Sequence, residues 1–156
     1  MTKITIDQVK NLREKTGAPV IRVKKVLEEV AGNETRAFKL LQKEGFEKAA
    51  KRQGRETGQG VIATYLHHNK KIVGVVELLC ETDFVARNEM FSKLADELAM
   101  QVASLDPKNA DELMDQDYIR DTQKKISDLV KEVIAKTGEN VRIGRIYRIE
   151  LGDGRE

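Results

Sequence analysis

Residues 79–88 read LCETDFVARN and stand between an apolar run and an amphipathic segment. The run at residues 72–79, IVGVVELL, is rich in Val and Ile, which favours a β-strand. From Glu89 onward apolar residues recur at helical spacing, so the pattern predicts a strand, a turn and then a helix. Within the turn, Asp83 directly precedes a large aromatic residue, Phe84. Two interpretations are open: Phe84 folds back into the core, as most phenylalanines do, or it is displayed for a partner.

The composition bounds the class of protein. The chain has 156 residues, of which 40% are hydrophobic and 35% are charged. No apolar run approaches the roughly 20 residues needed to span a bilayer, and no signal-peptide pattern follows the first three residues. Cys80 is the single cysteine, so no internal disulfide can form. We therefore expect a cytoplasmic protein.

Charge is distributed unevenly along the chain. Residues 1–55 contain 14 basic and 7 acidic residues, a net charge of +7. The remainder contains 14 basic and 19 acidic residues, a net charge of −5. This asymmetry predicts two modules whose partner surfaces differ in sign.

The first 53 residues predict three short amphipathic helices. Thr5 and Asn33 are suited to cap the first and third helices, Gly17 to end the first, and Pro19 to begin the second. The apolar residues expected on the inner faces are Ile6, Val9, Leu12, Val23, Val26, Leu27, Val30, Ala37, Leu40 and Leu41, with Phe46 as a further candidate. A bundle of this size is marginal alone, so we expect support from a neighbour or a partner.

The remaining residues, 54–156, predict an α+β core with a three-stranded antiparallel sheet packed against helices. Residues 60–66 and 71–79 form a hairpin whose second, almost wholly apolar strand should be central and covered on both faces. An apolar stripe predicts a long helix on the sheet, and its members are Phe91, Leu94, Ala95, Leu98, Ala99, Val102 and Leu105. Residues 126–134 predict the last helix, and residues 141–151 a closing strand, while residues 109–118 are ambiguous.

Catalytic chemistry has little support in the sequence. Cys80 is flanked by acidic residues that raise a thiol pKa, so it is better interpreted as a small core residue. The adjacent residues His67 and His68 would point to opposite faces of a strand and are poorly placed to hold one metal ion. There is no phosphate-binding glycine loop and no zinc motif. We expect neither an enzyme nor a cofactor or metal site.

The basic segment at residues 48–55, KAAKRQGR, has two interpretations. Clustered Lys and Arg suit the phosphates of a nucleic acid. However, no aromatic residue is interleaved for base stacking, so a solvated helix end that runs into a linker is the favoured interpretation.

Residues 77–88, ELLCETDFVARN, resemble the signature of the elongation factor Ts family, which typically reads ELNCETDFVARN. Residues 12–18, 23–27 and 136–150 also resemble the family's N-terminal ubiquitin-associated-like helical module and its terminal strand. The chain departs from the family at Leu79, usually Asn, and at residues 19–22, PVIR instead of the common GMMD. It resembles a short form, because only seven residues separate Leu105 from Leu113, where many members carry a long insertion.

The resemblance implies a guanine-nucleotide exchange factor that binds elongation factor Tu, the GTPase that delivers aminoacyl-tRNA to the ribosome. It places four residues of the turn against the partner: Thr82, Asp83, Phe84 and Val85. In that role Phe84 is a wedge beside the nucleotide site, and Asp83 disturbs the Mg²⁺ network, which tolerates little departure from octahedral geometry.

The same resemblance implies that the corner between the first two helices grips the GTPase domain, through Arg13, Val20 and Ile21. The factor itself is not expected to bind nucleotide. Two other functions stay open on the sequence, a small adaptor that binds without affecting nucleotide, and a ribosome-associated RNA-binding protein that uses residues 48–55.

Overall fold

The computed structural model describes residues 2–155 and contains two buried apolar clusters, one among the first three helices and one beneath a sheet. The elements in chain order are α1 (Ile6–Thr16), α2 (Val20–Glu29), α3 (Glu34–Lys51), β1 (Gln59–Leu66), β2 (Ile72–Cys80), α4 (Asp83–Ala86), α5 (Glu89–Leu105), α6 (Ala110–Asp115), β3 (Asp117–Tyr118), β4 (Asp121–Lys125), α7 (Ile126–Thr137) and β5 (Val141–Glu150). The predicted α+β class is confirmed. Within these residues no helix is both long and apolar enough to cross a membrane.

The N-terminal helices begin and end where the sequence indicates. The Thr5 side chain accepts a hydrogen bond from the Gln8 backbone N–H, and that of Asn33 accepts one from Arg36. Gly17 ends α1 in the left-handed conformation, with φ of 69°, which glycine adopts without steric penalty. One expectation is wrong: Ile6 is not buried in the bundle but is 86% exposed.

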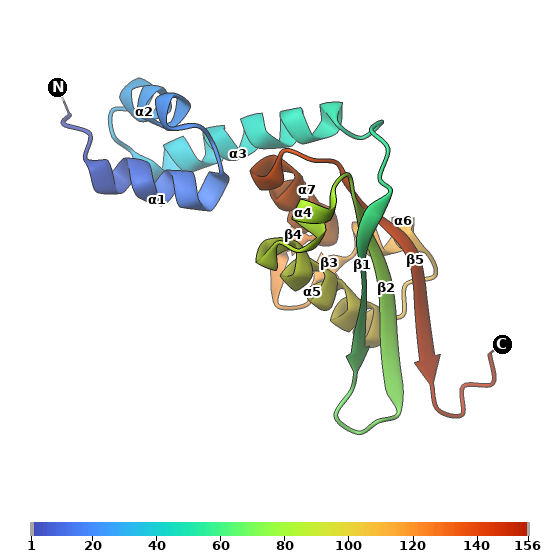
Figure 1. Cartoon of the computed structure of the whole chain (residues 1–156). Helices are drawn as coiled ribbons and strands as arrows, with labels where there is room; N and C mark the ends of the chain where they lie inside the picture. Colours follow the sequence, from blue (N-terminus) through green and yellow to red (C-terminus); the bar gives the residue numbers. More distant parts are fainter. Residues whose placement is uncertain (1, 156) are drawn as a thin grey trace.

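Helix α3 connects the two clusters (Figure 1). Its first half carries Ala37 and Leu41 in the smaller cluster, whereas Ala49 near its end is buried in the larger one. The Arg52 guanidinium then donates a hydrogen bond of 3.1 Å to the carbonyl oxygen of Ile134 in α7. The predicted boundary between residues 1–53 and 54–156 stays a prediction, and α3 packs against α7 just before it.

The larger group is built on the predicted three-stranded sheet, in the order β1-β2-β5 and antiparallel throughout. The β1–β2 register pairs Val61 with Leu78 and Ala63 with Val76. The pairing of β2 with β5 shifts between Val76 and Leu78, at a bulge or irregularity. As expected, the apolar strand β2 is the central one.

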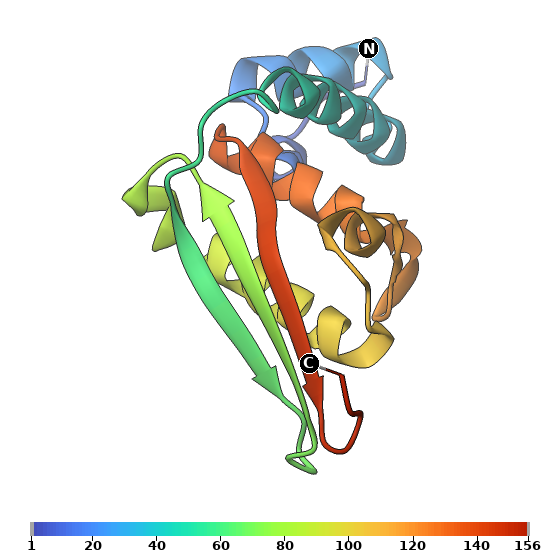
Figure 2. The same ribbon diagram turned by 90° about the vertical axis from the view of Figure 1, so that its right-hand side faces the viewer.

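The sheet is covered on one face (Figure 2), which corrects the expectation that β2 is covered on both. Alternate residues of β2 are buried, from Gly74 to Cys80, and the residues between them are only partly buried. On the open face Ile62, Tyr147 and Ile149 are exposed. An apolar sequence therefore lines both faces of β2, although helices cover only one of them.

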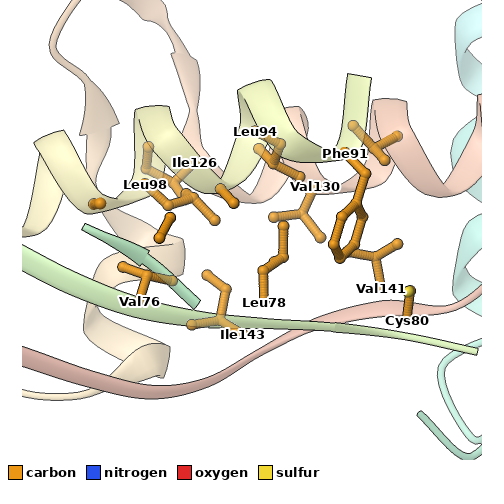
Figure 3. Packing of buried hydrophobic residues seen from close by; sticks show 14 of the residues in the cluster. Val76, Leu78, Cys80, Phe91, Leu94, Leu98, Ile126, Val130, Val141 and Ile143 are labelled. Atoms are coloured by element: carbon orange, nitrogen blue, oxygen red, sulfur yellow. The ribbon is translucent and has the colours of Figure 1, made fainter. Parts of the chain in front are cut away.

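Helix α5 lies across the inner face of the sheet, and α7 packs beside it (Figure 3). The predicted stripe is buried from Phe91 to Val102, but Leu105 at the end of the helix is exposed. The buried core residues labelled in Figure 3 are Val76, Leu78, Cys80, Phe91, Leu94, Leu98, Ile126, Val130, Val141 and Ile143.

The ambiguous segment after α5 forms α6 and the small β3–β4 hairpin. Gln101 of α5 is fully buried and holds this segment through its amide. Its Nε2 donates to the Asp117 carbonyl oxygen at 3.0 Å, and its Oε1 accepts from the Ile119 N–H at 3.2 Å. The hairpin is thus tied to α5 by side-chain hydrogen bonds that no local pattern indicates.

Replacing Gln101 by Leu keeps the volume and removes these hydrogen bonds. We expect the free energy of unfolding to fall by about 1–3 kcal/mol, because partly buried backbone groups lose their partner. Thermal melting measures the change, with Gln123→Leu on exposed β4 as the control, expected within about 0.5 kcal/mol of wild type. Equal melting of Gln101→Leu and wild type would contradict this role of Gln101.

Candidate partner-binding site

The turn after β2 presents one large apolar side chain to solvent. Thr82 caps the four-residue helix α4, its hydroxyl oxygen accepting a hydrogen bond from the Val85 N–H at 3.4 Å. Phe84 is 79% exposed, whereas Val85 packs against the larger core and Ala86 is buried. The interpretation in which Phe84 folds into the core is therefore wrong, since Val85 and Ala86 make the inward contacts.

Asp83 lies on the surface beside Phe84. Its carboxylate is 3.3 Å from the Arg87 guanidinium, and both side chains are at least half exposed. An exposed pair of this kind contributes little to stability and separates easily. Asp83 can therefore exchange Arg87 for another cationic group, and the turn carries an exposed carboxylate and an exposed aromatic ring at consecutive positions.

The backbone just before α4 is held by a residue far along the chain. The carboxylate of Glu139 accepts hydrogen bonds from the N–H groups of Glu81, at 3.1 Å, and Thr82, at 2.9 Å. Its second oxygen accepts the Thr82 hydroxyl at 2.6 Å. Sequence reasoning gave Glu139 no role, because 57 residues separate it from Thr82.

Cys80 has the properties of a core residue, as predicted. It is fully buried, and its thiol donates to the carbonyl oxygen of Thr82 at 3.1 Å. Burial, and then the negative charge of Glu139, raise the pKa of the Cys80 thiol. Such a group stays protonated near neutral pH and is a poor nucleophile.

The histidine pair lies at the end of the β1–β2 hairpin. His67 shares a hydrogen bond of 3.1 Å with the Tyr65 hydroxyl, and His68 is exposed. Across residues 2–155 no group of three or more His, Cys, Asp or Glu side chains is arranged to hold a metal ion.

A second surface lies between α1 and α2. An open groove of about 1130 Å³ separates them, and its lining includes Ile4, Ile6, Val9, Lys10, Arg13, Val20, Lys24 and Leu27. The structure thus brings the predicted Arg13 and Val20 to one groove. Ile21 does not line it but stands next to Val20 and is 82% exposed. Sequence reasoning missed the groove because it assigned Ile6 to the bundle core.

The basic segment at residues 48–55 begins in the last turn of α3, as its favoured interpretation as a helix end predicts. Lys48 and Lys51 are in the last turn of α3 and are exposed.

The turn that contains α4 lies at the end of the sheet nearest the N-terminal helices in both views (Figures 1 and 2). The two candidate surfaces therefore belong to the same end of the molecule.

Comparison with known proteins identifies the family. The family model described as "Elongation factor TS" matches residues 81–155. Proteins named "Elongation factor Ts" are 39% identical in Oleidesulfovibrio alaskensis, over 97% of this chain and 100% of the relative, and 38% identical in Thermotoga petrophila, over 99% of both. A third, from Clostridium botulinum, is 40% identical over 97% of this chain and 49% of the relative.

The first two alignments span 197 positions against the 156 residues of this chain, so those relatives carry at least 41 positions that have no counterpart here. The predicted short form agrees with this difference. At these identities and this coverage, the chain belongs to the elongation factor Ts family of translation elongation factors.

Proposed function

We propose that this protein is a guanine-nucleotide exchange factor that binds the GTPase domain of elongation factor Tu and promotes GDP release during elongation in the cytoplasm. The observation that carries the proposal is the exposed ring of Phe84 on a turn that is itself firmly attached to the core. An exposed Phe gains nothing for the fold, whereas in an interface it supplies a large apolar contact.

Exchange of nucleotide requires no bond-making by the factor. A factor accelerates GDP release when it binds the nucleotide-free GTPase more tightly than the nucleotide-bound one. The coupling free energy is typically about 1–3 kcal/mol. Bound nucleotide weakens the binding of the factor to the GTPase by the same amount as the bound factor weakens the binding of nucleotide. The factor therefore needs a group that fits only the nucleotide-free state.

Phe84 and Asp83 supply this preference in our proposal. The Phe84 ring inserts between side chains beside the nucleotide site and is accommodated once they have moved. The neighbouring Asp83 carboxylate then acts on the Mg²⁺ and water network, because Mg²⁺ demands near-octahedral coordination. Thr82 and Val85 set the direction of both side chains, one as the helix cap and the other by packing on the core.

The N-terminal helices supply affinity in this mechanism. Arg13 and Val20 line the groove between α1 and α2, and exposed Ile21 stands beside it. Lys10, Arg13 and Lys24 also place positive charge around the groove. One acidic residue, Glu28, also lines the groove, so its charge is positive on balance. A basic surface with an apolar floor suits an acidic partner surface, and its charge speeds association.

The decisive experiment follows the release of fluorescent GDP from purified elongation factor Tu. Acceleration by this protein at substoichiometric amounts supports exchange. Binding without acceleration would instead identify an adaptor, and salt-sensitive RNA binding without acceleration an RNA-binding protein.

Truncation of Phe84 to Ala should leave the fold intact and slow the catalysed release of GDP. Because Phe84 is 79% exposed, we expect melting close to wild type rather than the loss of about 3–5 kcal/mol typical of a buried Phe. Phe91→Ala is the matched control, since Phe91 is fully buried and its truncation should lower the melting temperature strongly. Normal exchange by a folded Phe84→Ala protein would remove Phe84 from the mechanism.

Neutralising Asp83 to Asn should also slow GDP release, because the change keeps the shape of the side chain and removes its charge. If the charge acts on Mg²⁺, the difference from wild type disappears when a chelator removes the ion. Asp96→Asn, an exposed change on α5, is the control and should exchange at the wild-type rate in both conditions. A defect that persists without Mg²⁺ would contradict this role.

Substitution of Ile21 by Ser should weaken the complex without changing the maximal rate. Truncation of an interface anchor typically costs about 1–2 kcal/mol, so the half-saturating concentration should rise about five- to thirtyfold. Leu151→Ser, a similarly exposed apolar residue after β5, is the control. A fall in the maximal rate with unchanged affinity would assign Ile21 to the exchange step instead.

A further inference from the structure

Two adjacent residues at the corner between α7 and β5 connect the parts of the chain that carry both candidate surfaces. Glu139 is partly buried and Asn140 is buried. Glu139 holds the turn before α4, and Asn140 holds the segment that follows α3. These segments are 57 and 87 residues away along the chain.

The Glu139 carboxylate holds the two residues that lead into α4. It accepts two backbone N–H groups, of Glu81 and Thr82, and the Thr82 hydroxyl, with distances between 2.6 and 3.1 Å. Hydrogen bonds to an ionised acceptor are about twice as strong as neutral ones. A helix of four residues has no stability of its own, so its direction depends on these bonds and on the inward contacts of Val85 and Ala86.

Asn140 acts on the other side of the corner. Its side-chain amide donates to the carbonyl oxygens of Gln53, at 3.2 Å, and Arg55, at 2.8 Å. The backbone N–H of Asn140 donates to the Glu81 carboxylate at 2.7 Å. The same carboxylate lies 3.5 Å from the Arg55 guanidinium. The segment that leaves α3 is therefore fixed to the same corner as the turn.

We propose that Glu139 and Asn140 are positioning residues for nucleotide exchange. Glu139 fixes the direction in which Phe84 leaves the surface, and Asn140 fixes the N-terminal helices at a set distance from Phe84. The corner itself does not need these side chains for packing, because the apolar residues on either side, Ile134 and Val141, are buried in the larger core. The inference rests on the proposed exchange function.

The first test compares Glu139→Gln with Thr82→Val. Both changes preserve size while removing a charge or a hydroxyl. Because a reacting group displaced by about 1 Å can lose about 100-fold in rate, we expect Glu139→Gln to lower the maximal GDP-release rate about tenfold. Its half-saturating concentration should change less than twofold. Glu132→Gln, on α7 and paired with Lys124, is the control expected to match wild type in both parameters.

A double-mutant cycle identifies the bond responsible. If Glu139 acts through Thr82, the double variant Glu139→Gln/Thr82→Val should exchange only slightly more slowly than Glu139→Gln, because the effects of coupled residues do not add. Fully additive effects would overturn the assignment. Proportional losses of maximal rate and folded fraction would show a merely structural role and would also overturn it.

Asn140→Ala should give the opposite kinetic pattern. With the segment after α3 released, we expect the half-saturating concentration to rise severalfold while the maximal rate is retained. An unchanged half-saturating concentration would remove Asn140 from the proposal.

A measurement without the partner separates this inference from the exchange function. In the free protein, amide hydrogen exchange at residues 81–85 should be faster in Glu139→Gln than in wild type and in Glu132→Gln. If wild type does not accelerate GDP release, the exchange function and the kinetic role of Glu139 fall together, while this measurement still decides whether Glu139 orders the turn. If wild type is active and Glu139→Gln matches it in both rate and amide exchange, the positioning role is wrong.

Discussion

The packing of α5 across the inner face of β1 and β2 is the contact on which the rest of the structure depends. The approach is so close that a Cβ atom at Gly74 would lie 2.2 Å from the carbonyl oxygen of Ala99. Only glycine fits there, and a side chain would force the helix away from the sheet. Phe91, at the start of the same helix, fills the core near Cys80 and Val141 (Figure 3). Phe91 is thus the aromatic residue of the core at this end of the sheet, whereas Phe84, seven residues earlier, is exposed.

The smaller cluster is joined to the larger one by the packing of α3 against α7. Among residues 2–155 its buried members are Val9, Leu12, Val23, Val26, Leu27, Ala37 and Leu41, which make a small core for three helices. Another contact joins these two helices: the ammonium group of Lys131 in α7 lies 5.7 Å from the centre of the ring of Phe46 in α3. A cation over an aromatic face contributes up to about 1 kcal/mol at an exposed site. These contacts place α7 against the helical bundle, where the sequence led us to expect a neighbour or a partner.

Periodicity and capping chemistry predicted most of the elements, because both are local properties of the sequence. The caps at Thr5 and Asn33, the hairpin, the helix from Phe91 and the closing strand all follow from them. Which side of an apolar element is covered is a property of its neighbours. The open face of β2 and the exposure of Ile6 therefore could not be predicted from their own segments.

The candidate site divides in the same way. The family resemblance pointed to the turn and to Phe84, but its exposure depends on the inward contacts of Val85 and Ala86. Glu139 bonds to residues that are far away in the sequence. Gln101 is a polar amide buried within the apolar stripe of α5. A single sequence contains no local pattern for either. The β3–β4 hairpin was not predicted either, because its polar strands lack an alternating apolar signal.

In our proposal the turn must be rigid while Phe84 remains exposed. A flexible turn would let the ring retreat when nucleotide-site side chains resist it, and ordering it in the complex would reduce the free energy available for displacing GDP. The carboxylate of Glu139 on two N–H groups and a hydroxyl fixes the backbone before binding. The exposed ring then keeps its whole contact area for the partner. Preorganisation of the backbone and exposure of the side chain are therefore parts of one requirement. The corner between α7 and β5 holds the backbone in place, so that α4 can keep the Phe84 ring exposed.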